Sequence, residues 1–249
     1  MVTSFSNSSG IRRTGDSSTT VERLWQQAPT WQLDASASVA RLQPGEAHDP
    51  RLTALVQRGW QTWLRQLEPH KDSNCSDAQA LATLKAFASF QVLCAVRDGP
   101  WGVNHLNQRI ASCLGLPLDG WYTGRPVMVT RNDYNLKLMN GDVGLCLPHS
   151  HGLRVAFPNG QGGIRWILPS RLDAAETVFA MTVHKSQGSE FDHVALVLPD
   201  RPVAVLTREL LYTGMTRAKA RLTLVVPQAN VLLHAVAVKV LRSGGLADL

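Results

Sequence analysis

A polar string at 182–192 and an arginine at position 217 are the residues best placed to do chemistry. The string, TVHKSQGSEFD, gathers hydroxyl, imidazole, amine, amide and carboxylate groups between two apolar runs that predict buried strands. Because α/β sheets bind ligands where their strands end, we expect a site there. Arg217 lies in LYTGMTRAKAR, on a predicted helix. Its guanidinium suits a phosphate on a neighbouring domain, where an arginine neutralises charge that develops on the γ-phosphate.

Another string has the spacing of a phosphate loop but the wrong chemistry. Residues 10–17, GIRRTGDS, follow the pattern GxxxxGK[ST] except that Asp16 stands in place of the lysine. A phosphate loop binds triphosphate through backbone N–H groups and one ammonium group, and a carboxylate adds repulsion instead. The polar residues 1–9 also predict no strand to precede such a loop. We therefore expect no phosphate binding here.

The composition is that of a globular chain with a basic balance. Apolar residues make up 44% and charged residues 18% of the 249 residues, and the net charge is +6. This charge fits a negatively charged partner such as nucleic acid, although it does not identify one. The sequence has no long apolar run and begins with polar residues. We therefore expect a soluble, cytoplasmic protein without a membrane span or a signal peptide.

The cysteines and histidines do not predict a metal site. The four cysteines are widely spaced and form no CxxC pair, which favours free thiols in a reducing cytoplasm. These residues are Cys75, Cys94, Cys113 and Cys146. His149 and His151 lie two residues apart in a loop-like stretch, where we favour a solvated loop over a metal site. We therefore expect no metal bound by this chain.

Apolar periodicity predicts an α/β region built from two separate parts of the chain. Leucine, valine and tryptophan residues between 52 and 67 fall on one helical stripe, and Asp77 can cap a second helix. The continuous apolar run at 91–96 predicts a strand buried on both faces, and Asn104 can cap the helix that follows. Further strands and helices are predicted at 178–183, 193–198, 207–219, 221–226 and 231–241.

The chain between these two parts has a different pattern. Short β-rich runs separated by turns occur at 126–130, 143–147, 153–157 and 164–168. Because no helix-length pattern separates them, these runs predict a small antiparallel barrel. We therefore expect one α/β domain, formed by residues 1–118 and 172–249 and interrupted by a β-barrel at 119–171. Residues 1–50 of that domain are not assigned to elements.

Taken together, the two polar strings resemble a family of DNA motors. TVHKSQGSEFD at 182–192 resembles motif V of superfamily 1 helicases, and LYTGMTRA at 211–218 resembles motif VI, in the same order and at a similar separation. The resemblance narrows to the RecD-type helicases, the alpha subunits of exodeoxyribonuclease V (RecBCD). The segments that carry it are FSNSSGI at 5–11, QVLCAVRDGPWGVNHLNQRI at 91–110, WYTGRPVMVTRNDYNLKLMNGDVG at 121–144 and LPSRL at 168–172.

The resemblance implies a RecA-like (P-loop NTPase-type) second motor domain, 2A, with a parallel sheet that is interrupted by a small SH3-like β-barrel insert, 2B. In this family ATP and Mg lie between two RecA-like domains and are bound mainly by the first. Carried over by motif position, Arg217 would be the arginine finger, and Gln187, Gly188 and Glu190 would face the nucleotide. Residues 3–5, TSF, stand where motif IV normally supplies a further arginine, so that arginine is missing.

The same resemblance implies a path for single-stranded DNA across the motor domains. The strand would touch the first half of motif V and two asparagine-bearing stretches at 131–140. The residues implied in DNA contact are Thr182, His184, Ser186, Arg131, Asn132 and Asn140. A motor that moves along DNA must ignore sequence, so these contacts should fall on phosphate and sugar and should weaken with salt.

For the whole protein the resemblance implies ATP-driven unwinding with 5′-to-3′ translocation, in double-strand break repair and linear DNA degradation in the bacterial cytoplasm. The implied partners are RecB, RecC and the N-terminal RecA-like domain that carries the phosphate loop and the magnesium-binding acidic pair. Neither of those motifs occurs in this sequence. We therefore expect that the chain alone does not hydrolyse ATP. A RecD2-like arrangement, which works without RecB and RecC, stays open.

Two other classes of function also stay open at this point. The chain could be a nucleic-acid-binding module without motor function, using the barrel and the basic surface. Alternatively, it could be an interaction subunit for RecB and RecC whose motor motifs no longer act. Arg217 within a complete motif VI argues against the simple binding module, which has no use for such an arginine.

Overall fold

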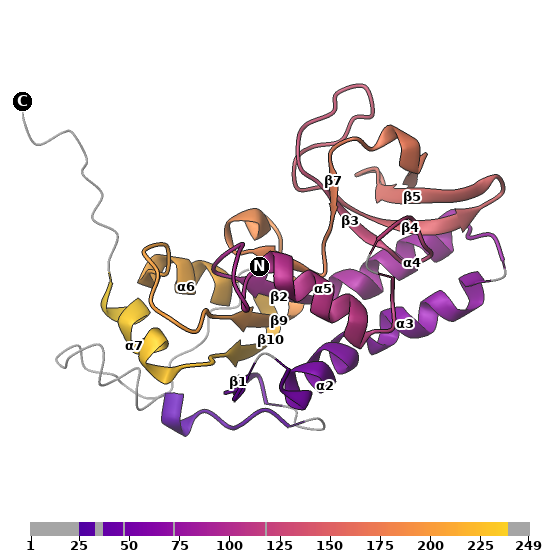
Figure 1. Cartoon of the computed structure of the whole chain (residues 1–249). Coiled ribbons are helices and arrows are strands. Elements are labelled where there is room, and N and C mark those ends of the chain that lie inside the picture. The colour runs from indigo at the N-terminus through magenta and orange to yellow at the C-terminus, as the bar shows by residue number, and fades with distance from the viewer. Residues whose placement is uncertain (1–24, 33–36, 47, 72, 118, 239–249) are drawn as a thin grey trace, which may run out of the picture.

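Two five-stranded sheets form the framework of the molecule. The computed structural model describes residues 25–32, 37–46, 48–71, 73–117 and 119–238. Figure 1 shows one sheet at the centre and the other to one side of it, above α3 and α4. The string at 10–17 and the FSNSSGI segment lie outside the described residues. None of the helices within the described ranges is long and apolar enough to cross a membrane.

The central sheet is parallel, which confirms the expected α/β class. Its strands follow the order β1-β10-β9-β2-β8, and every pairing between neighbours is parallel. The five strands are β1 (Val39–Leu42), β10 (Ala218–Val225), β9 (Phe191–Val197), β2 (Phe90–Cys94) and β8 (Ala180–Thr182). All five residues of β2 are buried, as expected for a strand covered on both faces.

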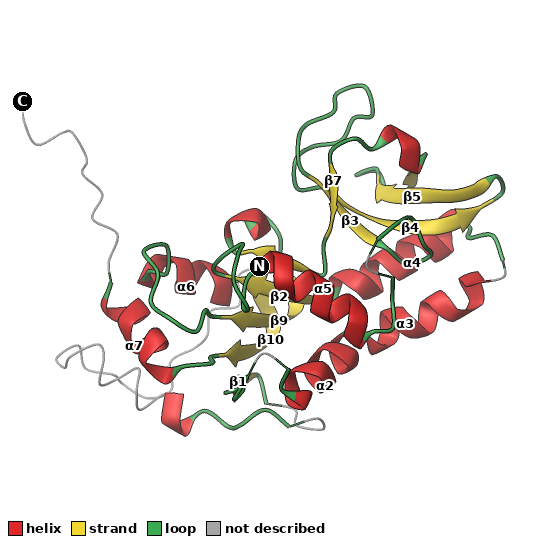
Figure 2. Ribbon diagram, viewed as in Figure 1, coloured by secondary structure: helices red, strands yellow, loops and turns green. Residues whose placement is uncertain are grey.

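Helices cover both faces of this parallel sheet (Figure 2). Alternate strand residues point to opposite faces, so Val92 and Cys94 pack in one core cluster, and Leu93 and Ala95 pack in the other. The first face is covered by α2 (Pro50–Gly59), α3 (Gln61–Leu67), α4 (Asp77–Ala88) and α5 (Val103–Cys113). The second face is covered by α6 (Arg208–Met215) and α7 (Ala229–Ala237).

An aromatic cluster explains why the single helix expected at 52–67 is two helices. The break falls at Trp60, which is fully buried and stacks on Phe87 at 5.6 Å between ring centroids. At Gly59 a Cβ would collide with the ring of Phe90, so the chain turns where only glycine fits. The apolar stripe predicted correctly which residues are buried, but the shape of the core decides where the helix ends.

Two of the expected helix caps were assigned to the wrong residue. The N-cap of α4 is Ser76, not Asp77, because Ser76 and Gln79 form a reciprocal capping box. The carboxylate of Asp77 instead accepts a hydrogen bond from the indole of Trp166 at 2.8 Å. The N-cap of α5 is Gly102, and Asn104 lies inside the helix.

The second sheet, here called the inserted sheet, is antiparallel throughout. Its order is β6-β5-β4-β3-β7, and among the described strands no pairing joins β6 to β7. The strands are β3 (Pro126–Val129), β4 (Val143–His149), β5 (Gly152–Pro158), β6 (Ile164–Ile167) and β7 (Ala175–Thr177). A five-stranded antiparallel sheet is therefore present, whereas its closure into a barrel stays a prediction. Strand β7 extends this sheet beyond residue 171, where we had placed its boundary.

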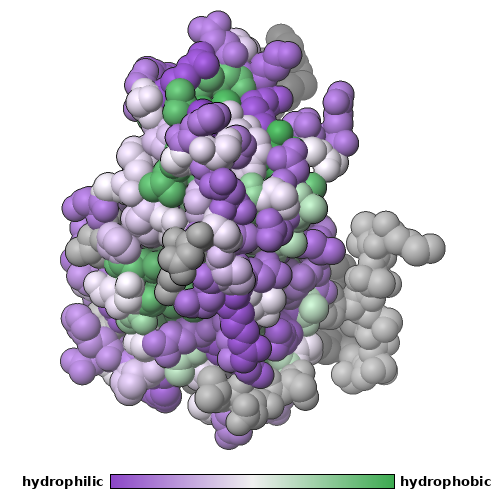
Figure 3. Space-filling view, turned by 90° about the vertical axis from the view of Figure 1, so that its right-hand side faces the viewer, coloured by the Kyte–Doolittle hydropathy of each residue, from purple (hydrophilic) through white to green (hydrophobic). Residues whose placement is uncertain are grey.

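The inserted sheet is fixed to the helices beneath it. The indole of Trp166 in β6 donates to Asp77 at the start of α4, and the Cys75 amide donates to the Pro148 carbonyl at 2.9 Å. Leu145 of β4 belongs to the same buried cluster as Trp60. On the side drawn in Figure 3, the surface is mostly hydrophilic and its hydrophobic patches are small and separate. The inserted sheet thus shares a core with the α/β region.

Candidate functional site

The polar string at 182–192 runs between two opposite edges of the parallel sheet. Thr182 ends β8 and Phe191 begins β9, and both strands run parallel to β2, which lies between them. We call the side where β8, β2 and β9 end the carboxyl edge, and the side where β9 and β10 begin the amino edge. The string must therefore travel back from the carboxyl edge to the amino edge. Our expectation of one site at the strand ends is corrected, because its residues divide between two edges.

At the carboxyl edge, the string is tied to the inserted sheet. The hydroxyl of Thr182 accepts a hydrogen bond from the Lys185 amide at 3.3 Å, and His184 is exposed in the 3-10 turn His184–Ser186. The ammonium of Lys185 donates to the side-chain oxygen of Asn140 at 2.7 Å, although the two residues are 45 positions apart. Thr182, His184 and Asn140, which we had expected near DNA, thus lie in one region together with a lysine.

The loop between β3 and β4 carries the remaining candidates for DNA contact. The amide of Asn140 donates to the side-chain oxygen of Asn132 at 2.8 Å, which holds the two ends of the loop together. Asn132 and its neighbour Arg131 are both exposed. Arg131 and Asn132 also line a shallow cavity of about 350 Å³ with Arg171. The loop therefore presents exposed polar side chains beside this cavity.

Ser186 is the candidate that the structure removes from the surface. Its side chain is fully buried, and its hydroxyl donates to the Val183 carbonyl at 2.7 Å. A hydroxyl that closes its own turn and has no exposed surface does not reach DNA in this arrangement. Ser186 instead supports the turn that presents His184 and Lys185.

The residues expected to face a nucleotide lie on the stretch that leads from the carboxyl edge to the amino edge. Gln187, Gly188 and Glu190 are all exposed. Gly188 has φ of +86°, a left-handed conformation that glycine adopts without strain. One guanidinium nitrogen of Arg217 donates to the Ser189 carbonyl at 3.2 Å. The arginine and the second half of the polar string therefore meet, as the sequence interpretation required.

Arg217 lies in a junction and not on a helix as we had expected. Helix α6 ends at Met215, and β10 begins at Ala218. The Phe191 amide donates to the Arg217 carbonyl at 2.8 Å, so the backbone of Arg217 already continues the pairing of β10 with β9. A second guanidinium nitrogen, Nε, donates to the Thr213 carbonyl at 3.2 Å. These contacts hold the half-buried side chain at the amino edge.

Two side-chain amides that sequence reasoning missed, the buried Gln91 and the half-buried Asn107, hold the segment before the string in place. The side-chain oxygen of Asn107 in α5 accepts from the amides of Phe179 and Ala180 at 2.7 and 2.8 Å. The amide of Gln91 in β2 donates to the Phe179 carbonyl at 2.8 Å. An unpaired buried backbone group is costly, so these side chains fix the segment that leads from the inserted sheet into β8. Both lie in the 91–110 segment, but no local pattern marks them.

The surroundings of His193, near the start of β9, keep its imidazole uncharged. Burial, with a smaller contribution from the nearby Arg221, lowers the pKa of His193 to about 4. Its ring shares a hydrogen bond of 2.9 Å with the hydroxyl of Thr223 in β10. His193 is therefore uncharged at neutral pH and adds no positive charge to this edge. No group of three or more potential metal ligands occurs within the part of the chain that is described.

Comparison with known families identifies the part of the chain that contains these features. A family described as the UvrD-like helicase C-terminal domain matches residues 177–225. This range begins at the end of β7 and includes the whole polar string, Arg217 and β10. It does not include β2 or the loop between β3 and β4.

Curated relatives extend the match to most of the described chain. The RecBCD enzyme subunit RecD of Mycobacterium tuberculosis is 44% identical over 172 residues, which cover 67% of this chain and 29% of that protein. The same subunit of Haemophilus influenzae is 38% identical over 220 residues, which cover 82% of this chain and 33% of that protein. The chain is RecD-like. Together with the UvrD-like helicase C-terminal domain, this is consistent with the C-terminal part of a RecD protein of the superfamily 1 helicases.

The chain is also similar to a helicase of the RecD2 type. The ATP-dependent RecD2 DNA helicase of Deinococcus radiodurans is 34% identical over 139 residues, 53% of this chain and 19% of that protein. The chain thus spans about a third or less of the length of these relatives.

Among solved structures, one of two coordinating Pif1 helicases at forked DNA covers 68% of this chain at 16% identity, with a TM-score of 0.38. That score is too low to support any inference from the alignment.

Proposed function

We propose that this chain is the second motor domain of an ATP-dependent 5′-to-3′ DNA helicase of the RecD type. The observation that carries the proposal is the contact between the Arg217 guanidinium and the Ser189 carbonyl at 3.2 Å. It sets a cation, held by backbone groups, at Ser189, whose chain neighbours Gly188 and Glu190 are exposed. A guanidinium presented in this way from one domain can stabilise the γ-phosphate held by another.

ATP and its Mg ion are, in this proposal, bound mainly by the first RecA-like domain. That domain supplies the phosphate loop and the acidic pair for magnesium, which the present sequence does not contain. Residues of the amino edge then complete the nucleotide site from the opposite side. The chain on its own is inactive as an ATPase, because it lacks the groups that hold the triphosphate.

Single-stranded DNA occupies the carboxyl edge in this proposal. Thr182, His184 and Lys185 offer hydroxyl, imidazole and ammonium groups there, and Arg131 and Asn132 add a further cation and an amide from the loop of the inserted sheet. Donors of this kind bind phosphate and sugar without reading the bases. The segment 183–190 connects this edge to the amino edge, so closure on ATP moves the DNA contacts.

The same relatives support a proposal for the inserted sheet and for the complete protein. We propose that the inserted sheet corresponds to the SH3-like 2B module, and that the complete protein works with RecB and RecC in double-strand break repair and linear DNA degradation. The RecD subunits named above support this assignment over the stand-alone RecD2 arrangement, since they match a larger share of this chain.

The test is DNA-stimulated ATP hydrolysis by a protein that includes the first motor domain. Arg217→Ala should lower the rate by roughly 10³-fold or more, because an arginine finger contributes about 10³–10⁵ in rate. Arg221→Ala is the matched control, since Arg221 is an exposed arginine four residues further along β10. The control should retain the wild-type rate. Equal rates for the Arg217 variant and the wild type would contradict the motor assignment and favour a nucleic-acid-binding module.

A further inference from the structure

The path of the chain leaves a crevice between the two central strands β2 and β9. After β2 the chain enters α5, which packs on one face of the sheet and leads toward β8. After β9 it enters α6, which packs on the other face and leads to β10. The two connections therefore leave neighbouring strands in opposite directions. Parallel α/β sheets bind ligands at such a point, outside the carboxyl ends of the strands.

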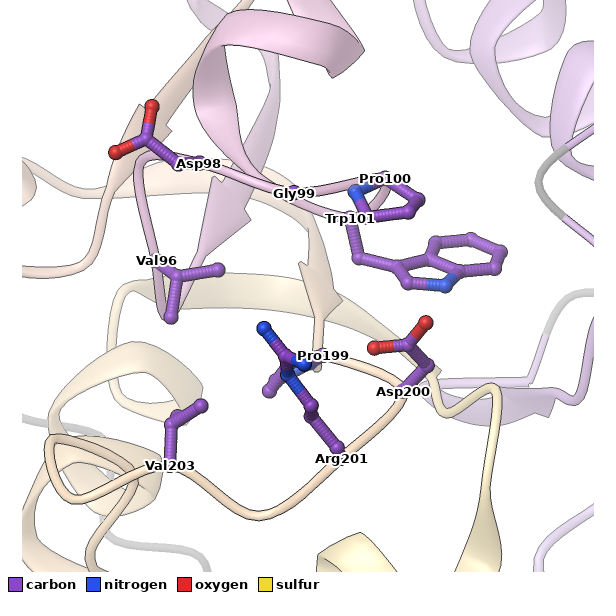
Figure 4. Close-up of a pocket in the computed structure, with 9 residues that line it drawn as sticks. All are labelled: Val96, Asp98, Gly99, Pro100, Trp101, Pro199, Asp200, Arg201 and Val203. Atoms are coloured by element: carbon purple, nitrogen blue, oxygen red, sulfur yellow. The ribbon is translucent and has the colours of Figure 1, made fainter.

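A pocket of about 420 Å³ lies at this point. It is lined by Val96, Asp98, Gly99, Pro100, Trp101, Pro199, Asp200, Arg201 and Val203. Figure 4 shows the loop after β2 on one side of the pocket and the loop after β9 on the other. The volume lies within the range of small-ligand pockets, roughly 300–1,000 Å³. Cys94 in β2 pairs with Thr182 in β8 on one side and with Val197 in β9 on the other. The pocket and Thr182 therefore lie on the same carboxyl edge.

The wall after β2 is rigid before any ligand arrives. The Val103 amide donates to the Val96 carbonyl at 3.1 Å, and the Asn104 side chain donates to the Asp98 carboxylate at 2.7 Å. At Gly102 a Cβ would lie 2.5 Å from the carbonyl oxygens of Arg97 and Asp98, so only glycine allows this tight turn. A wall fixed in this way loses little freedom on binding, which favours affinity.

The lining combines apolar walls with one cation, Arg201, and two carboxylates, Asp98 and Asp200. Val96, Pro100, Pro199 and Val203 supply the apolar surface, and the guanidinium of Arg201 points into the space between the loops (Figure 4). The carboxylate of Asp98 points away from that space and is held by Asn104. The carboxylate of Asp200 lies between Trp101 and Arg201 (Figure 4). This combination suits a flat, uncharged ring that carries both a hydrogen-bond acceptor and a donor. A bare phosphate would gain nothing from the apolar walls.

We infer that this pocket receives one base of a single-stranded nucleic acid. The inference rests on the proposed function, in which the strand crosses the carboxyl edge at Thr182. Neighbouring strands of a sheet lie about 4.8 Å apart, so the pocket is within the reach of about one or two nucleotides from the end of β8. Every base has a flat face and at least one acceptor that faces a groove, so a single guanidinium can serve any sequence.

The experiment compares two oligonucleotides that differ only in their bases. Binding of the 249-residue chain to fluorescent single-stranded DNA is measured by anisotropy, once with normal bases and once with abasic sites of the same backbone charge. We expect the abasic strand to bind the wild-type chain about tenfold more weakly, the loss typical of one base contact. The Arg201→Gln variant should bind the normal strand several-fold more weakly and should discriminate less between the two strands.

A matched pair of substitutions separates the pocket from its surroundings. Val203 lines the pocket, whereas Val205, two residues further on, is 50% exposed and lies outside it. Val203→Phe should fill the pocket and abolish the difference between normal and abasic strands, whereas Val205→Phe should preserve it. Thermal unfolding of both variants checks that the fold is intact. If Val203→Phe unfolds the chain, Arg201→Gln alone decides the result.

The outcomes distinguish this inference from the proposed function. Equal binding of normal and abasic strands by the wild-type chain would overturn the base pocket and leave the proposed strand path intact. The base pocket would also be overturned if Val203→Phe or Arg201→Gln kept the full wild-type difference in affinity between normal and abasic strands. Failure of the chain to bind either strand at low salt would overturn both proposals.

Discussion

The two edges of the parallel sheet carry different chemistry although one short segment joins them. The amino edge holds the half-buried Arg217 against backbone carbonyls, beside the uncharged His193. The carboxyl edge exposes His184, ties Lys185 to the inserted sheet and opens into a pocket between β2 and β9. One edge is therefore built to hold a single cation in a fixed place, and the other offers several donors over a wider surface.

Because the two edges differ in the arrangement of their charged and polar groups, one domain can bind two different ligands at separate places. A cation fixed by two carbonyl oxygens suits one phosphate of a small ligand, whereas dispersed donors suit a long polyanion. The segment 183–190 spans the sheet between them and contains the buried Ser186 and the left-handed Gly188. In the proposed mechanism, a shift at one edge reaches the other through this segment.

A change that keeps the charge of the amino edge should still slow ATP hydrolysis strongly. Arg217→Lys preserves the cation but removes the planar fork that donates to both Ser189 and Thr213. In a protein with the first motor domain, we expect ATP hydrolysis to fall by about 10²-fold or more, while the affinity for single-stranded DNA stays unchanged. Steady-state ATPase rates and anisotropy titrations measure the two quantities. A parallel loss of DNA affinity would erase the distinction between the edges.

A smaller effect is expected at the carboxyl edge, on DNA alone. Lys185→Ala removes the ammonium and its hydrogen bond to Asn140. The chain should bind single-stranded DNA about tenfold more weakly, and the slope of log affinity against log salt should fall by about 0.7, the value for one lost phosphate contact. Lys219→Ala is the control, because Lys219 is an exposed lysine in β10 near the amino edge. Equal slopes for both variants would indicate that charge, and not its position, governs binding.

The segment between the edges should respond to backbone strain. Gly188→Ala forces a side chain into the left-handed region, although no atom lies within 4 Å of the added Cβ. The free energy of unfolding should fall by about 1 kcal/mol, as measured by denaturant titration. Gly45→Ala also adds its Cβ in open space, but at a residue without positive φ, and it should have no such cost. A neutral result for Gly188→Ala would show that the turn relaxes freely.

The smallest effect concerns the pH dependence of the amino edge. The pKa of His193 is about 4 in the fold and roughly 6.5 in an unfolded chain, so the unfolded state binds a proton first as the pH falls. The stability that comes from keeping His193 uncharged is complete above pH 6.5 and is lost between about 6.5 and 4. His193→Gln should remove part of this loss of stability. The fall in melting temperature between pH 6.5 and 4 should therefore be smaller by about 2–4 °C than in the wild type. An unaltered pH profile would mean that His193 is not the responsible group.

Much of the framework could be predicted from residue pattern alone. The buried runs at 91–96 and 193–198 and the β-rich runs at 126–168 follow from local periodicity, and the structure places strands at all of them. The meeting of Arg217 with the polar string was also expected, because two motifs of known order must come together to work. The features that could be predicted are those that depend on residues close together in the sequence.

The remainder depends on contacts between residues far apart in the sequence. Trp60 ends a helix because of the aromatic rings packed on it, and Lys185 finds Asn140 across 45 positions. Asn107 reaches the backbone of Ala180 in the same way, from 73 positions away. The division of the polar string between two edges follows from strand order, which no local pattern contains. The pocket after β2 and β9 depends on that order too.

The most direct test of the two-edge arrangement is hydrogen–deuterium exchange of the chain with and without single-stranded DNA. Peptides that cover 95–104 and 182–187, at the carboxyl edge, should exchange more slowly when DNA is bound. Peptides that cover 212–219, at the amino edge, should exchange at the same rate with and without DNA. Protection at 212–219 with none at the carboxyl edge would contradict the account, because DNA would then occupy the surface assigned to the nucleotide.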